Sequence, residues 1–181
     1  MINEQIKQDA SIKQEGNAFV FGGTHPSQIG DILADIFILA PKRLSMGLVS
    51  KSVWLQAKEL YNKNASKMFQ CSSLELRGHS LGGGNALLTL IFLLRDNYPG
   101  NITLKTIGSI KPISRKVAKW IDAQTFIRSC KDIETSITWT VRHRDIVPFL
   151  GWWSKPTKTI VYEGDKRKHF LDFAGKEHVA Y

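Results

Sequence analysis

The stretch from Ser73 to Arg95 places a glycine-rich turn between a strand-like and a helix-like segment. Before the turn, Leu74 and Leu76 alternate with polar residues, which is typical of a β-strand. After the turn, residues 85–95 are long and apolar enough to form a buried helix. A strand that passes through a sharp turn into a buried helix is the repeating unit of folds in which helices cover a sheet.

The rest of the chain alternates in the same way and predicts one α/β domain over residues 1–181, with a mostly parallel central sheet and helices on both faces. Residues 1–16 are expected to be a poorly packed N-terminal extension. Ser50 is the expected N-cap of one helix. The apolar face of that helix is formed by Val53, Trp54, Ala57, Leu60 and Tyr61. Further strands are expected over residues 18–21, 102–107, 137–142 and 157–162, and further helices over 29–37 and 114–126.

Composition excludes several classes of protein. An apolar content of 43% with 23% charged residues is ordinary for a globular domain. The longest strongly apolar stretch, residues 86–94, is about half the length that a membrane-spanning helix needs, and residues 1–15 lack the apolar core of a signal peptide. We therefore expect a cytoplasmic location as synthesised. Cys71 and Cys130 have neither metal-site nor redox spacing, and we interpret both as reduced thiols.

The formal net charge of +9 favours an acidic partner, such as an anionic membrane surface. The positive charges are spread along the chain, and the densest cluster, Lys166-Arg167-Lys168, is interpreted as a solvated loop. No recognised DNA- or RNA-binding motif accompanies the charge, which argues against nucleic acid as the partner.

The turn itself, Gly78-His79-Ser80-Leu81-Gly82, has the composition of a nucleophile turn. A Gly-x-Ser-x-Gly pattern alone is weak, but its position between a strand and a helix strains the serine backbone and lifts the hydroxyl above the sheet edge. Side chains at positions 78 and 82 are expected to collide with the neighbouring strand and helix. A phosphate-binding loop would need a Lys-Ser/Thr ending or a Gly-x-Gly-x-x-Gly spacing, and the turn has neither. Ser80 is thus the candidate nucleophile.

A serine nucleophile needs a base and an acid, which follow it in the order serine, acid, histidine on this kind of fold. Asp145 comes just after the predicted strand 137–142, where the chain leaves the end of the sheet. His143 is too close to that aspartate to serve as its base. We predict His178 as the base, with His169 as the alternative.

The motifs together resemble the class 3 lipase family, the fungal triacylglycerol lipase type within the α/β-hydrolase superfamily. The resemblance rests on residues 78–83 and on the segment Asp145-Ile146-Val147-Pro148, and it extends over roughly residues 18–181. Phe21-Gly22-Gly23-Thr24 is similar to the family's Phe-Arg-Gly-Thr/Ser segment, and His178-Val179-Ala180-Tyr181 resembles its terminal His-x-x-Tyr.

The resemblance implies a catalytic triad of Ser80, Asp145 and His178, and an oxyanion hole formed by Thr24 and the amide of Leu81. It implies no metal and no cofactor. It also implies that the segment after Thr24, residues 25–38, covers the site as a lid, although packing on the core is an equal alternative. Gly22 replaces the family's usual arginine. Two other departures, the lack of any sign of the family's disulfides and Lys111 in a Gly-Ala-Pro-like stretch, bear on substrate and compartment more than on the reaction.

The function expected from these patterns is hydrolysis of a lipid ester through an acyl-Ser80 intermediate. Triglyceride, phospholipid and small-ester substrates remain open. The apolar loop of residues 149–153 is expected near the same face, where it could line an acyl pocket or touch an anionic membrane. An acyltransferase or thioesterase on the same fold, and an inactive binding protein, are the alternatives. The sequence does not indicate an oligomeric state.

Overall fold

The computed structural model describes residues 11–23, 41–142 and 159–163. The strands within these ranges are β1 (Ile12–Glu15), β2 (Ala18–Phe21), β3 (Pro41–Leu44), β4 (Gly47–Ser50), β5 (Ser73–His79), β6 (Asn101–Ile107), β7 (Thr135–Arg142) and β8 (Thr159–Glu163). The helices are α3 (Lys51–Phe69), α4 (Leu81–Arg95) and α5 (Arg115–Ser129).

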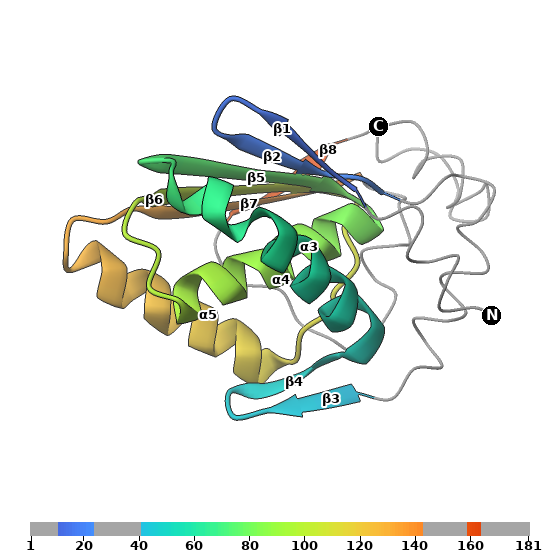
Figure 1. The fold of residues 1–181 in the computed structure, drawn as a ribbon. Coiled ribbons are helices and arrows are strands. Elements are labelled where there is room, and N and C mark those ends of the chain that lie inside the picture. The colour runs from blue at the N-terminus through green and yellow to red at the C-terminus, as the bar shows by residue number, and fades with distance from the viewer. Residues whose placement is uncertain (1–10, 24–40, 143–158, 164–181) are drawn as a thin grey trace.

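The main sheet of the described residues has the strand order β1-β2-β5-β6-β7-β8. The strands from β2 to β8 are parallel to their neighbours, whereas β1 pairs antiparallel with β2 at one edge. The described helices α3, α4 and α5 lie on the same side of this sheet (Figure 1). The predicted α/β architecture with a mostly parallel sheet is confirmed, whereas the described residues place no helix on the second face, where the sequence predicted helices as well.

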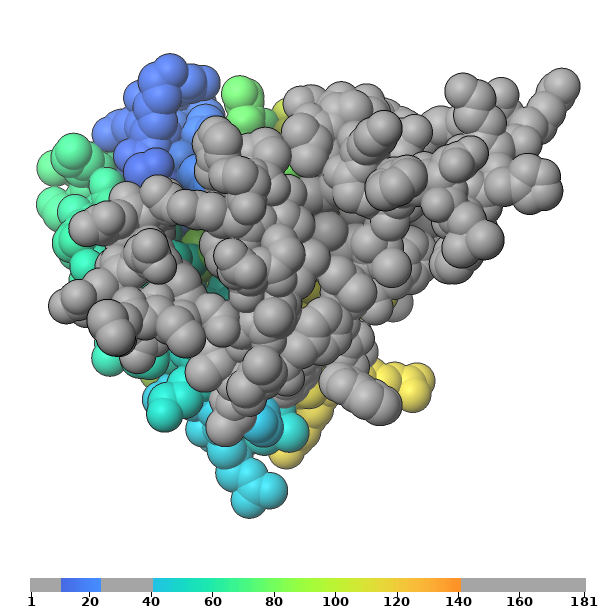
Figure 2. Space-filling model, turned by 90° about the vertical axis from the view of Figure 1, so that its right-hand side faces the viewer, coloured from blue at the N-terminus to red at the C-terminus, as the bar shows by residue number. Residues whose placement is uncertain are grey.

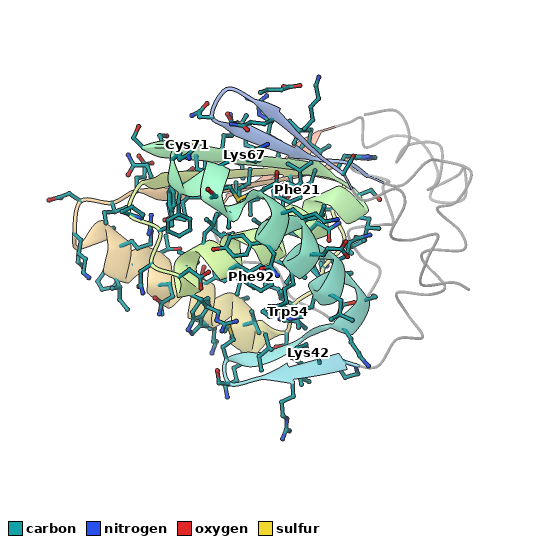
Figure 3. All side chains as sticks on the ribbon, in the orientation of Figure 1. Phe21, Lys42, Trp54, Lys67, Cys71 and Phe92 are labelled. Carbon is teal, nitrogen blue, oxygen red and sulfur yellow. The ribbon has the colours of Figure 1, made fainter. Side chains whose placement is uncertain are left out.

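Helix α4 lies at the centre of the domain, because its residues from Leu81 to Leu94 are all buried. It packs between the sheet and α3, the helix that the sequence predicted from the N-cap Ser50. The rings of Trp54 on α3 and Phe92 on α4 lie 4.5 Å apart between their centroids (Figure 3). Tyr61 stacks on the same phenylalanine at 5.2 Å. An amphipathic helix thus covers one that is apolar on all sides, which is the burial that each pattern requires.

Arg128 fixes the far end of α5 to the sheet. Its guanidinium group is buried and donates to the carbonyl oxygens of Tyr98 and Gly100, and its Nε donates to the hydroxyl of Thr135 at 2.9 Å. A buried cation needs such partners, because an unpaired one would cost several kcal/mol. The arginine therefore joins α5 to β7 and to the turn between α4 and β6.

Two elements were not indicated by the sequence. β1 lies within the predicted N-terminal extension, yet it pairs with β2 along its whole length. The hairpin of β3 and β4 forms a separate two-stranded sheet. Helix α4 also begins at Leu81 rather than at Asn85, so Gly82, Gly83 and Gly84 belong to its first helical turn.

Four predicted segments lie outside the described residues: the helix 29–37, the lid 25–38, the apolar loop 149–153 and the cluster 166–168.

Within the described ranges, none of the helices has both the length and the apolar character needed to cross a membrane. Both cysteines have free thiols.

Candidate active site

Ser80 occupies the junction between β5 and α4. Its backbone angles, φ 53° and ψ −123°, lie outside the left-handed helical region that Asn and Asp tolerate. Such a conformation costs a non-glycine residue on the order of 1–3 kcal/mol. The cost is imposed by the sharp reversal from a central parallel strand into a buried helix, the geometry that a nucleophile turn has.

The peptide groups of Ser80 are held by hydrogen bonds from both sides. Its amide donates to the carbonyl oxygen of Ile107, at the end of β6, at 3.1 Å. Its carbonyl oxygen accepts from the amides of Gly83 at 3.1 Å, Gly84 at 3.3 Å and Ile110 at 3.4 Å. The turn is therefore tied to the first turn of α4 and to the loop after β6, so the serine has a fixed position.

The glycines of the turn are required by backbone packing. A Cβ atom on Gly78 would overlap the backbone of Gly82. A Cβ atom on Gly82 would in turn overlap the carbonyl oxygen of Phe21 and lie 2.7 Å from that of Gly22. These contacts confirm the sequence interpretation that side chains at positions 78 and 82 would collide with the neighbouring strand and helix.

The loop after β2 passes directly beside the turn. A Cβ atom on Gly23 would lie 2.9 Å from the carbonyl oxygen of His79. Thr24 follows Gly23 in the sequence, but it lies outside the described residues. Leu81 begins α4, so its amide is one of the first four, which have no acceptor within the helix. The positive end of the helix dipole lies at the same place.

The structure describes part of the predicted site. Ser80 and Leu81 lie together at the carboxyl end of β5. Asp145, His178 and the alternative base His169 lie outside the described residues. β7, which ends at Arg142 and precedes the predicted acid by three positions in the chain, runs parallel to β6. Its carboxyl end therefore lies on the same edge of the sheet as the serine turn. The assignment of Asp145 as the acid stays a prediction.

Two buried polar groups behind the turn were not identified from the sequence. Asn85 on α4 donates from Nδ2 to Oε1 of Gln56 on α3 at 2.6 Å, and both side chains are buried. A polar residue within an otherwise apolar helix was the available signal. The loop after β6 also carries Lys111, next to Ile110. Burial lowers the pKa of the Lys111 ammonium group.

No group of three or more His, Cys, Asp or Glu side chains that could hold a metal ion occurs in the part of the chain that the structure describes. What this part presents is a serine with a strained backbone at the start of a buried helix.

The parallel sheet, the serine turn and the buried helix after it define an α/β-hydrolase fold. The sequence pattern of the class 3 lipases matches residues 18–154, so the chain belongs to the class 3 lipase family, as its motifs indicated.

Solved structures agree with this fold. The Lip2 lipase of Yarrowia lipolytica is similar with a TM-score of 0.62 and 22% identity, covering 82% of this chain and 57% of that one. The triacylglyceride lipase of Rhizomucor miehei is similar with a TM-score of 0.63 and 21% identity, covering 79% of this chain and 56% of that one. A triacylglycerol lipase of Penicillium expansum is similar with a TM-score of 0.59 and 15% identity, covering 86% of this chain and 63% of that one. The chain thus spans somewhat more than half the length of these lipases. No curated protein matches its sequence.

Proposed function

We propose that the chain is a serine carboxylester hydrolase that acts on a lipid ester. The Oγ atom of Ser80 attacks the ester carbonyl carbon while His178, oriented by Asp145, accepts the hydroxyl proton. The negative charge on the carbonyl oxygen is stabilised by the amide of Leu81 and by Thr24. The C–O bond then breaks, the alcohol leaves with the proton from His178, and water hydrolyses the acyl-Ser80 intermediate.

The observation that carries this proposal is the backbone of Ser80. A strained conformation at a non-glycine residue persists only where the surrounding structure enforces it, and it is concentrated at functional sites. Here β5, β6, α4 and the loop after β2 all enforce it. Family membership supports the same reaction, because solved structures with a similar fold include triacylglycerol lipases.

A lipid substrate fits the apolar loop of residues 149–153 and the net charge of +9, which favours esters presented at an anionic surface. The proposal therefore includes phospholipids among the substrates, alongside triglycerides. It requires no metal and no cofactor.

The test is hydrolysis of nitrophenyl esters of increasing chain length, measured beside a Ser80→Ala variant. We expect the variant to lose at least about 1,000-fold in kcat/KM, since removal of a triad nucleophile leaves only the oxyanion hole and binding. Treatment with a phosphonate ester should add its mass to the peptide that contains Ser80. Equal turnover by the two proteins would contradict the nucleophile assignment.

Separate His178→Ala and His169→Ala variants identify the base. We expect only the first to lose activity, because the second histidine directly follows the basic cluster of residues 166–168, which we interpret as a solvated loop. Offering an alcohol alongside water separates a hydrolase from an acyltransferase, since the latter would transfer most of the acyl group to the alcohol.

A further inference from the structure

The hairpin of β3 and β4 is attached to the chain that leads into α5. The amide of Leu48 donates to Oγ of Ser114 at 3.0 Å, and the amide of that serine donates back to the leucine carbonyl oxygen at 2.9 Å. The amide of Ser50 donates to the carbonyl oxygen of Pro112 at 2.8 Å, and Val49 bridges to Ile113. The hairpin and the start of α5 thus form one unit.

This unit carries positive charge from three elements. We call Lys42 and Arg43 on β3, Lys51 at the start of α3, and Arg115 and Lys116 at the start of α5 the basic hairpin cluster. Lys42 is partly exposed, and the other members are exposed. A Cβ atom on Gly47 would lie 3.2 Å from the Cβ atom of Lys116, so the start of α5 directly adjoins the hairpin turn.

No negative charge is built into the same segments. Residues 41–58 and 108–121 contain neither Asp nor Glu. The first turns of α3 and α5 hold no acidic residue, although a helix N-terminus favours one. The ion pairs found among the described residues involve other cations, such as Lys63 with Glu59 at 2.8 Å. The basic hairpin cluster is therefore a concentrated positive surface.

The cluster lies beside the candidate active site. The loop that leaves β6 first contacts Ser80, through the amide of Ile110, and then pairs with the hairpin at Ile113. Figure 1 places the hairpin next to the start of α5, below α3. Figure 2, which looks onto the end of the molecule where the parallel strands finish, shows the cyan hairpin projecting at the rim, beside the yellow start of α5.

We propose that the basic hairpin cluster docks the protein on an anionic lipid surface, with the active-site end of the sheet beside the contact. This rests on the proposed function in one respect, because a lipid ester is the reason to hold this end of the molecule at a membrane. The hairpin suits docking, since Leu44 and Met46 pack against the core and hold its cations on a fixed support. A cation near an anionic membrane strengthens binding about fivefold.

The experiment uses the full chain with Ser80→Ala, so that no lipid is consumed, and measures co-sedimentation with vesicles of phosphatidylcholine alone or mixed with phosphatidylglycerol. The test protein also carries Lys42→Gln, Arg43→Gln and Lys51→Gln. We expect its partition onto the anionic vesicles to fall on the order of 100-fold at low salt, because three cations each contribute about fivefold. Binding to neutral vesicles should not change.

A matched control carries Lys67→Gln, Arg95→Gln and Lys131→Gln, which remove the same charge from exposed positions near the C-terminal ends of the three described helices. We expect this control to lose at most a few-fold. An equal loss in both triple variants would overturn the proposal, because net charge and not the cluster would then drive binding. The proposal would also be overturned if the hairpin variant kept its binding to anionic vesicles but lost binding to a DNA duplex, because the cluster would then serve nucleic acid and not lipid.

The two proposals fail separately. With Ser80 restored, the hairpin variant should hydrolyse a soluble nitrophenyl ester as the unmodified chain does, since none of its changes touches the serine turn. A chain that docks through the cluster but hydrolyses no ester would contradict the hydrolase and leave the docking surface standing.

Discussion

Gly82 and Gly84 lie in the same first turn of α4, and replacing each by alanine separates packing at the site from helix propensity. Alanine is favoured over glycine in a helix by roughly 1 kcal/mol, and neither glycine has a positive φ. The intrinsic gain is thus equal at both positions. Any difference between the variants must come from what the new methyl group meets.

At position 82 the methyl group meets backbone. It would overlap the carbonyl oxygen of Phe21 and lie 2.7 Å from that of Gly22, and neither oxygen can move without shifting the loop after β2. At position 84 the nearest atoms are Cγ1 at 2.7 Å and Cδ1 at 2.9 Å in the side chain of Ile110, which can shift more readily than a backbone carbonyl group. Overpacking a rigid site costs about 1–3 kcal/mol and a yielding one less.

We therefore expect Gly82→Ala to lower the free energy of unfolding by up to about 2 kcal/mol, once the helix gain is subtracted from the overpacking cost. Gly84→Ala should stay within about 1 kcal/mol of the unmodified chain. Because the displaced loop leads to Thr24, a shift of about 1 Å should reduce kcat/KM for a soluble ester on the order of 100-fold in Gly82→Ala alone.

Urea denaturation gives the two stabilities, and steady-state hydrolysis of a short nitrophenyl ester gives the two activities. If Gly82→Ala proves as stable and as active as Gly84→Ala, the close approach of the β2 loop to α4 does not position the site, and this reasoning is wrong.

Two further predictions concern charged groups away from the turn. Hydrogen bonds from Arg77 and Lys105 lower the pKa of Glu75 to about 2, so its contribution to stability is present above the ordinary value near 4.5 and is lost as the pH falls towards 2. The lowering of the Glu75 pKa corresponds to roughly 3 kcal/mol of stability. Because Arg77 and Lys105 are half exposed, solvent screening reduces this contribution to about 1 kcal/mol. Glu75→Gln should cost that amount at neutral pH in urea titrations, and a difference as large at pH 2 as at neutral pH would refute the ion-pair origin. Arg128→Lys should lower the free energy of unfolding by about 2–4 kcal/mol, because an ammonium group cannot reach acceptors on three sides. The check is thermal unfolding of this variant beside a Lys131→Gln control, because the Lys131 side chain is exposed. Equal melting temperatures of the two variants would contradict the role given to Arg128.

The elements that the sequence predicted are those with a strong periodic pattern. The apolar face of α3, from Val53 to Tyr61, is buried as expected, and β2, β5, β6 and β7 lie within a few residues of their predicted bounds. Helix α4 begins four residues before the predicted start, because the low helix propensity of three successive glycines conceals the close neighbours that require them in the first turn. These neighbours are the backbone at the end of β2 beside Gly82 and the loop after β6 beside Gly83 and Gly84.

The hairpin could not be predicted in the same way. Its residues, such as Arg43 and Ser45, alternate with only partly buried apolar ones, and its pairing with residues 112–114 joins parts of the chain that are far apart in sequence. The candidate site was predicted best where local geometry defines it. Ser80 could be identified from its neighbours alone, whereas Asp145 and His178 depend on how distant strands end, and they stay predictions.

β1 has a consequence for the solubility of the chain. It covers the outer edge of β2, whose Phe19 and Phe21 belong to the core, and it presents Lys13 and Glu15 outward as an exposed ion pair. Unpaired strand edges next to apolar residues are templates for intermolecular pairing, and charges on the outermost strand oppose it. A chain shortened past Glu15 would therefore keep the serine turn but expose the unpaired edge of β2, and we expect it to aggregate before it loses the fold of the site.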